Sequence, residues 1–232
     1  MPNKANAGTM NEEKACAYCG RSATTMDHIP PRKLFPQPWS NDLITVPCCK
    51  SCNNYASGDD EYFIWVVTIN AKAAGSEADE ARRQRLKMPA SSRRRRMATR
   101  LVNARSPVDI ITPAGVWLGR AMGYNVDLGR VDRVLERVVR GLYFIERGCR
   151  VLPQNLFVAA HAEPPPDAFH WPTIQTLIAR GGRSVARGAF EYWFSAVDDR
   201  PEWALCLMRF FGGVLALGFI VDDRIESREG LA

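Results

Sequence analysis

The sequence predicts an α+β fold: a small zinc-stapled module, then a helical basic segment, then an α+β domain with a mainly antiparallel sheet. Three observations predict it. Two Cys-x-x-Cys pairs lie near the start of the chain, a segment rich in Lys and Arg follows, and helical and strand-like apolar patterns follow one another after that. With 232 residues, the chain is long enough to bury a core.

The two cysteine pairs are Cys16–Cys19 and Cys49–Cys52. Each pair turns tightly enough to direct both sulfurs at one ion, and four thiolates are a common ligand set for tetrahedral zinc. We therefore predict structural Zn²⁺ at Cys16, Cys19, Cys49 and Cys52. Cys48 is an alternative ligand in the second pair, but the spacing of Cys49 matches that of the first pair.

The cysteine content also bears on the compartment. Seven cysteines leave an odd set of three outside the predicted zinc site, and free thiols beside zinc thiolates fit a reducing environment. The most apolar run, 203–221, contains Arg209 and a Gly212-Gly213 break, which is typical of two strands and a turn. We expect a cytoplasmic protein that does not bind membranes.

The composition changes along the chain indicate four segments. We expect a flexible tail at 1–13, the zinc module at 14–71, a basic helical linker at 72–106 and an α+β C-terminal domain of unknown role at 107–232. Within the module, one strand fits in 21–28 and a second at 43–46, and four prolines keep the chain between them irregular. A helix is expected to start near Asn53 or at Ser57.

The basic segment is predicted to be helical with a break near Pro89. Residues 72–105 contain eleven Lys or Arg and three acids, and Arg93, Arg94, Arg95 and Arg96 are the densest charge. A run of this kind is a solvated helix face, a flexible connector or an arm that contacts nucleic-acid phosphates. We take these four arginines as candidate nucleic-acid contacts.

The C-terminal domain shows one long helical pattern and four strand-like runs. Apolar residues recur at helical spacing over 131–145, and Arg130, Arg133, Arg137 and Arg140 lie largely opposite them. These arginines could form a nucleic-acid surface, a partner surface or a solvated face, and we prefer the solvated face. The predicted strands are 156–162, 189–197, 204–211 and 214–221.

The residues with catalytic chemistry lie between and beside the cysteine pairs. Asp27 and His28 are adjacent, and Asn53 directly follows the last cysteine. Carboxylate and amide oxygens bind hard divalent metals, and an imidazole can move a proton near neutral pH. This set predicts hydrolysis of an anionic substrate. His161 and His170 have no such neighbours and are interpreted as ordinary histidines.

Four motifs together resemble the HNH endonuclease family. They are Cys-x2-Cys at 16–19, Asp-His-Ile-Pro-Pro at 27–31, Asn-Asp-Leu-Ile-Thr-Val-Pro at 41–47 and Cys-x2-Cys-Asn at 49–53. The resemblance covers about residues 14–63 and implies a ββα-metal fold with a four-cysteine zinc site.

The resemblance also implies roles for single residues. His28 would be the general base, Asp27 and Asn53 would bind a divalent Mg²⁺ or Mn²⁺, and Asn41 would brace the loop that orients the base. The family usually has the bracing Asn directly before the Leu, where this chain has Asp42. Where some members have a third His, this chain has Ser57; Asp60 or Glu61 could assist the metal.

The sequence therefore predicts a metal-dependent endonuclease that acts on DNA. Two alternatives remain open: a catalytically inactive zinc module that binds nucleic acid, and a nuclease that acts on RNA. One metal and one base make one cut, so cleavage of both strands would need either a homodimer or successive nicks. The C-terminal domain is the expected site of such assembly, or of contact with a partner protein.

Overall fold

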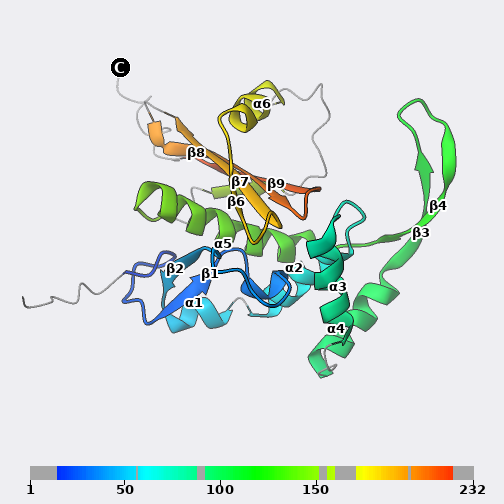
Figure 1. The fold of residues 1–232 in the computed structure, drawn as a ribbon, viewed down its shortest axis with the longest axis horizontal. Coiled ribbons are helices and arrows are strands. Elements are labelled where there is room, and N and C mark those ends of the chain that lie inside the picture. The colour runs from blue at the N-terminus through cyan, green and yellow to red at the C-terminus, as the bar shows by residue number, and fades with distance from the viewer. Residues whose placement is uncertain are drawn as a thin grey trace, which may run out of the picture.

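The computed structural model describes residues 15–55, 57–87, 92–151, 156–159, 171–197 and 200–221. The predicted tail at 1–13, His161 and His170 lie outside these residues. The described part is an α+β fold (Figure 1) whose sheets are antiparallel. A four-cysteine cluster lies next to the first strand pair. The predicted fold class is confirmed.

The first module consists of two short strands followed by two helices. Strands β1 (Thr25–His28) and β2 (Thr45–Cys48) pair antiparallel, with His28 opposite Thr45. A short 3-10 helix, η1 (Arg32–Leu34), lies in the proline-rich connection. Helices α1 (Lys50–Tyr55) and α2 (Ser57–Ile69) follow the second cysteine pair. Both helix starts that the sequence suggested therefore exist, as two separate helices.

The basic segment forms two helices, as predicted. They are α3 (Ser76–Lys87) and α4 (Ser92–Asn103). Pro89, near which the break was predicted, lies outside the described residues. A two-stranded ribbon then follows, made of β3 (Arg105–Ile111) and β4 (Trp117–Tyr124), and it projects away from the rest of the molecule (Figure 1). This ribbon was not predicted from the sequence.

The long helix α5 (Leu128–Arg147) has clear ends. The Asp127 side chain accepts a hydrogen bond from the Arg130 backbone N–H at the start, and Gly148 adopts φ of 68° at the end. The Asp127 side chain bonds a backbone N–H group that would otherwise be unpaired in the first turn, which favours a helix start there. Glycine adopts the left-handed conformation with little strain, and this conformation ends the helix at Gly148.

The last part of the chain forms a five-stranded antiparallel sheet in the order β5-β9-β8-β7-β6. Its strands are β5 (Leu156–Ala159), β6 (Arg183–Val185), β7 (Phe190–Val197), β8 (Arg200–Phe210) and β9 (Val214–Ile220). All four predicted strands are present, while β6 and helix α6 (Trp171–Ala179) were not predicted.

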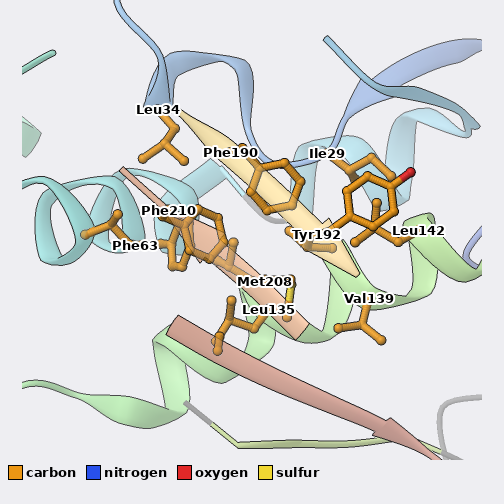
Figure 2. Packing of buried hydrophobic residues seen from close by; sticks show 14 of the residues in the cluster. Ile29, Leu34, Phe63, Leu135, Val139, Leu142, Phe190, Tyr192, Met208 and Phe210 are labelled. Atoms are coloured by element: carbon orange, nitrogen blue, oxygen red, sulfur yellow. The ribbon is translucent and has the colours of Figure 1, made fainter. Parts of the chain in front are cut away.

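Helix α5 lies between the first module and the sheet (Figure 1). A Cβ at Gly141 would come within 2.5 Å of Ile29 in the module, and one at Gly218 in β9 would come within 2.5 Å of Val139. These two close approaches show that α5 packs tightly on both sides. The sheet also contacts the module directly, since the rings of Phe63 and Phe210 pack edge to face with their centroids 5.5 Å apart (Figure 2).

One buried hydrophobic cluster therefore extends from the first module through α5 into the sheet (Figure 2). A smaller cluster packs α6 on the other face of the sheet, around Ile174, Trp193 and Leu207. The predicted domain boundaries stay predictions, but the core is continuous across the one at 106. Among the described helices, none has the length and apolar character needed to cross a membrane.

Candidate metal and catalytic site

The four predicted zinc ligands lie together. The sulfurs of Cys16, Cys19, Cys49 and Cys52 are all within 4.8 Å of one another, and Cys19 Sγ is 3.6 Å from Cys49 Sγ. Zinc–sulfur bonds of about 2.3 Å in a tetrahedron place the sulfurs about 3.8 Å apart. The cluster therefore has the ligand set and spacing of a structural zinc site.

Cys48 lies outside this cluster although it is adjacent to one of the ligands. Its side chain is 0% exposed, and its Sγ donates to the Cys49 carbonyl at 3.3 Å. Burial raises the pKa of the Cys48 thiol to about 12, so it stays protonated. The structure thus places Cys49 in the cluster, as the spacing predicted.

The first cysteine pair is held by a tight turn. The Gly20 N–H donates to the Cys16 carbonyl at 2.9 Å, and the Cys16 N–H donates to the Arg21 carbonyl at 2.7 Å. Gly20 has φ of 76°, a conformation that glycine adopts readily. This turn directs the sulfurs of Cys16 and Cys19 to the same side.

Helix α1 connects the cysteine cluster to the candidate catalytic residues. It contains Cys52 and, directly after it, Asn53. The Asn53 Nδ2 group donates to Thr25 Oγ1 at 3.1 Å and to the Met26 carbonyl at 3.4 Å, both on β1. These bonds fix the amide beside the strand that contains Asp27 and His28, and they leave its carbonyl oxygen available as a ligand.

His28 lies at the end of β1 and lines an open cleft of about 290 Å³. Asp27, Asn53 and Asp60 line the same cleft, and Arg32 lies at its side. Burial lowers the pKa of His28 and the Arg32 cation lowers it further, while Asp27 acts in the opposite direction. The neutral imidazole, which can accept a proton, is therefore favoured near pH 7.

Asp27 is nearly buried and has two partners. The Tyr18 hydroxyl donates to Asp27 Oδ2 at 2.8 Å, and Arg137 Nε from α5 lies 3.4 Å from the same oxygen. Burial and the nearby Asp27 raise the pKa of Tyr18, which keeps its hydroxyl protonated as a donor. Asp27 is therefore held at a fixed place beside His28.

Arg137 also binds a second carboxylate, Asp60 on α2. Burial raises the pKa of Asp60 to about 6, and this outweighs the opposing effect of the Arg137 cation. Asp27 and Asp60 are both largely buried and share the guanidinium group of Arg137. When both carboxylates are ionised, one negative charge is therefore left uncompensated. A divalent cation would satisfy this charge, since buried ions need a partner.

Among the arginines of α5, Arg133 is exposed, but Arg130 and Arg140 are half-buried and Arg137 is buried. For these three residues the interpretation as a solvated face was wrong. Arg130 Nε lies 2.7 Å and Arg133 Nε 2.8 Å from the carboxylate of Asp59, and Arg140 donates to the Tyr18 carbonyl at 2.6 Å. Helical periodicity shows which residues share a face. It does not show that the acids of another element cover that face.

The shared ion pair predicts the effect of removing Arg137. We expect Arg137→Gln to lower the free energy of unfolding by about 3–5 kcal/mol, because it leaves buried carboxylates without their cation. Urea denaturation measures the loss. Arg133→Gln is the matched control: its side chain is 51% exposed, so we expect a loss below about 1 kcal/mol. Equal losses for the two variants would contradict the structural role of Arg137.

Asn41 is not placed at the cleft. It is exposed in the loop before β2, and next to it both carboxylate oxygens of Asp42 accept the Ala186 N–H at 3.1 Å. This contact ties the loop to the C-terminal sheet. The bracing role of Asn41 stays a prediction.

Three further residues contribute to this site and were not predicted to do so, namely Tyr18, Arg32 and Arg137. Arg32 is near His28 in the chain, and its charge could have been noted there. Arg137 is far from Asp27 in the sequence, and only tertiary packing brings the two together. On α2, Ser57 and Glu61 also line the cleft, so the two acids named in advance, Asp60 and Glu61, are both at the site.

No family model, no curated protein and no solved structure matches the chain.

Proposed function

We propose that this protein is a metal-dependent endonuclease of the HNH type that hydrolyses DNA phosphodiester bonds. One observation supports this most strongly. Strands β1 and β2 and helix α1, held at one end by the cysteine cluster, bring Asp27, His28 and Asn53 to one open cleft. A carboxylate, an imidazole and an amide in one cleft can bind a cation and move a proton.

The proposed site fits a divalent cation in its donor set. The Asp27 carboxylate, the Asn53 amide oxygen and the Asp60 carboxylate would hold Mg²⁺ or Mn²⁺, since these ions prefer oxygen ligands. When bound, the ion would neutralise charge on the phosphate and on the leaving oxygen. The cysteine cluster would hold a separate structural Zn²⁺.

The side chains of the cleft would perform the remaining steps. Neutral His28 would take the proton from a water molecule as that water attacks the phosphorus. Arg32 and Lys33, which also line the cleft, would attract and orient the phosphate. Tyr18 and Arg137 would keep Asp27 in place through the contacts described above.

The direct test is cleavage of supercoiled plasmid DNA by the full chain in Mg²⁺, Mn²⁺ or EDTA. We expect nicked or linear product with the metal ions and intact plasmid in EDTA. Intact plasmid under all three conditions, from a folded protein that contains zinc, would contradict the proposal for DNA. Single-stranded RNA in the same buffers tests the RNA alternative.

A specific contact favours the second candidate, a zinc module that binds nucleic acid without cutting it. Arg137 already pairs with both Asp27 and Asp60, so a guanidinium group stands beside the place that the catalytic cation would take. In that case DNA binding would persist in EDTA, and no divalent ion would produce cleavage.

The arginines of α4 are the proposed contact with the DNA backbone. Arg95 and Arg96 are exposed on this helix. We expect the change of Arg93 to Arg96 to glutamine to weaken binding equally for unrelated DNA sequences and to reduce the slope of log K against log salt by about 0.9 for each lost phosphate contact. Fluorescence anisotropy at several salt concentrations measures the slope. An unchanged slope would show that the four arginines are only solvated.

A further inference from the structure

The ribbon formed by β3 and β4 exposes an unusual amount of apolar surface. Of the sixteen large hydrophobic residues that are exposed in the described part of the chain, eight lie between 108 and 124. The ribbon projects from the body and pairs only within itself as a two-stranded sheet (Figure 1). An isolated two-stranded ribbon is marginally stable in water, and exposed apolar patches mark interaction sites.

The strand register separates the two faces of the ribbon, because residues directly opposite each other point to the same side. On one face, Asp109 lies opposite Arg120, with Asp109 Oδ1 2.9 Å from Arg120 Nε. We call this the Asp109 face. Its apolar members are Pro107, Ile111, Trp117, Met122 and Tyr124. Of these, Ile111, Trp117 and Met122 are 58%, 61% and 53% exposed.

The charges of the ribbon argue against nucleic acid as the partner. Residues 105–124 contain three charged side chains, Arg105, Asp109 and Arg120, with a net charge of +1. Surfaces that bind DNA neutralise several phosphates and are strongly positive. A ribbon with this little charge fits a mostly apolar protein surface better than nucleic acid. On the Asp109 face the charged residues are Arg105, Asp109 and Arg120.

We propose that the Asp109 face binds the same face of a second copy of this chain. In this dimer a two-fold axis runs parallel to the strands, between the two facing ribbons. It places β3 of one copy over β4 of the other, and each residue keeps its position along the strand direction. Asp109 then lies opposite Arg120 of the second copy, and the reverse pair forms by symmetry. In the same way, Ile111 of one copy contacts Trp117 of the second copy. The face is thus complementary to itself in charge and in apolar contact.

The size of the ribbon sets the expected strength of the dimer. Seven paired positions span about 23 Å, and two strands give a face about 10 Å wide. In outline, each face is on the order of 230 Å², below the roughly 600 Å² per partner of weak specific interfaces. We therefore expect a weak dimer that forms only at high protein concentration and dissociates on dilution. This inference does not depend on nuclease activity.

Analytical ultracentrifugation of the full chain tests the dimer and its charge pairs. At high concentration we expect a mass twice the 26.0 kDa of one chain. Asp109→Arg and Arg120→Asp should each weaken the homodimer at least about tenfold, because like charges then face each other. An equimolar mixture of the two variants should restore dimers. Each variant alone has lost its own internal pair, so recovery in the mixture can come only from contacts between chains.

The opposite face of the ribbon provides the matched control. Val108 and Ile110 lie on it and are 44% and 46% exposed. We expect Val108→Ser and Ile110→Ser to leave the mass unchanged and Trp117→Ser to reduce it. A monomer at every concentration would overturn the proposal, as would a mixture of the two charge variants that stays monomeric or a loss of dimer through the Val108 face alone.

Discussion

His28→Ala is expected to reduce DNA cleavage by a factor of about 10²–10⁴, because general acid–base groups typically contribute that much to a rate. The loss should be in the cleavage step, since the imidazole would act on the attacking water. DNA binding should change little, because Arg32, Lys33 and the arginines of α4 would still contact the phosphates. Plasmid cleavage and fluorescence anisotropy, measured side by side, separate the two effects.

His161→Ala is the matched control for this experiment, because it removes a histidine that is remote in sequence from the cysteine pairs. We expect its cleavage rate to stay within about twofold of the unchanged protein, as is usual for a residue outside the chemistry. Zinc content should equal that of the unchanged protein in both variants. Full cleavage by His28→Ala at normal zinc content would rule out His28 as the base.

Cys52→Ser should have the largest effect on folding. Structural zinc contributes about 10–16 kcal/mol of apparent binding free energy in zinc-finger peptides, and that energy is folding energy. Cys52 also lies in α1 directly before Asn53. We therefore expect loss of zinc, loss of helix and strand signal from the module in circular dichroism, and loss of cleavage even with added Mg²⁺.

Cys48→Ala is the control for Cys52→Ser, because it removes a buried thiol without removing a zinc ligand. Cys48 is fully buried, whereas Cys52 is half-buried, and Cys48 stands outside the cluster. We expect one zinc ion per chain to remain, and a stability loss on the order of 1 kcal/mol for the truncated side chain. If Cys48→Ala lost zinc and Cys52→Ser kept it, the assignment of the ligands would be wrong.

The local part of the site could be predicted because its signals are close together in the chain. Two x2 spacings fix the sulfur pairs, and Asp27, His28 and Asn53 lie beside them. The strands at 204–211 and 214–221 could be predicted equally well, because an apolar run that is interrupted by two glycines predicts a hairpin. The helix at 131–145 followed from its apolar period.

The ribbon at 105–124 was missed because its apolar residues are not buried. Alternation of apolar and polar residues reveals a strand only when one face is covered, and both faces of this ribbon are exposed. Helix α6 was also missed, since it is short and packs on the sheet through only a few residues such as Ile174 and Leu177.

The sequence by itself therefore determined the four clustered cysteines, the fold class and which Asp, His and Asn line the cleft. Only the tertiary structure decided what surrounds them. The pairing of Arg137 with Asp27 and Asp60, and of Arg130 and Arg133 with Asp59, requires α5 to pack against the module. Contacts of this kind depend on how distant elements pack, and neither spacing nor periodicity along the chain records that.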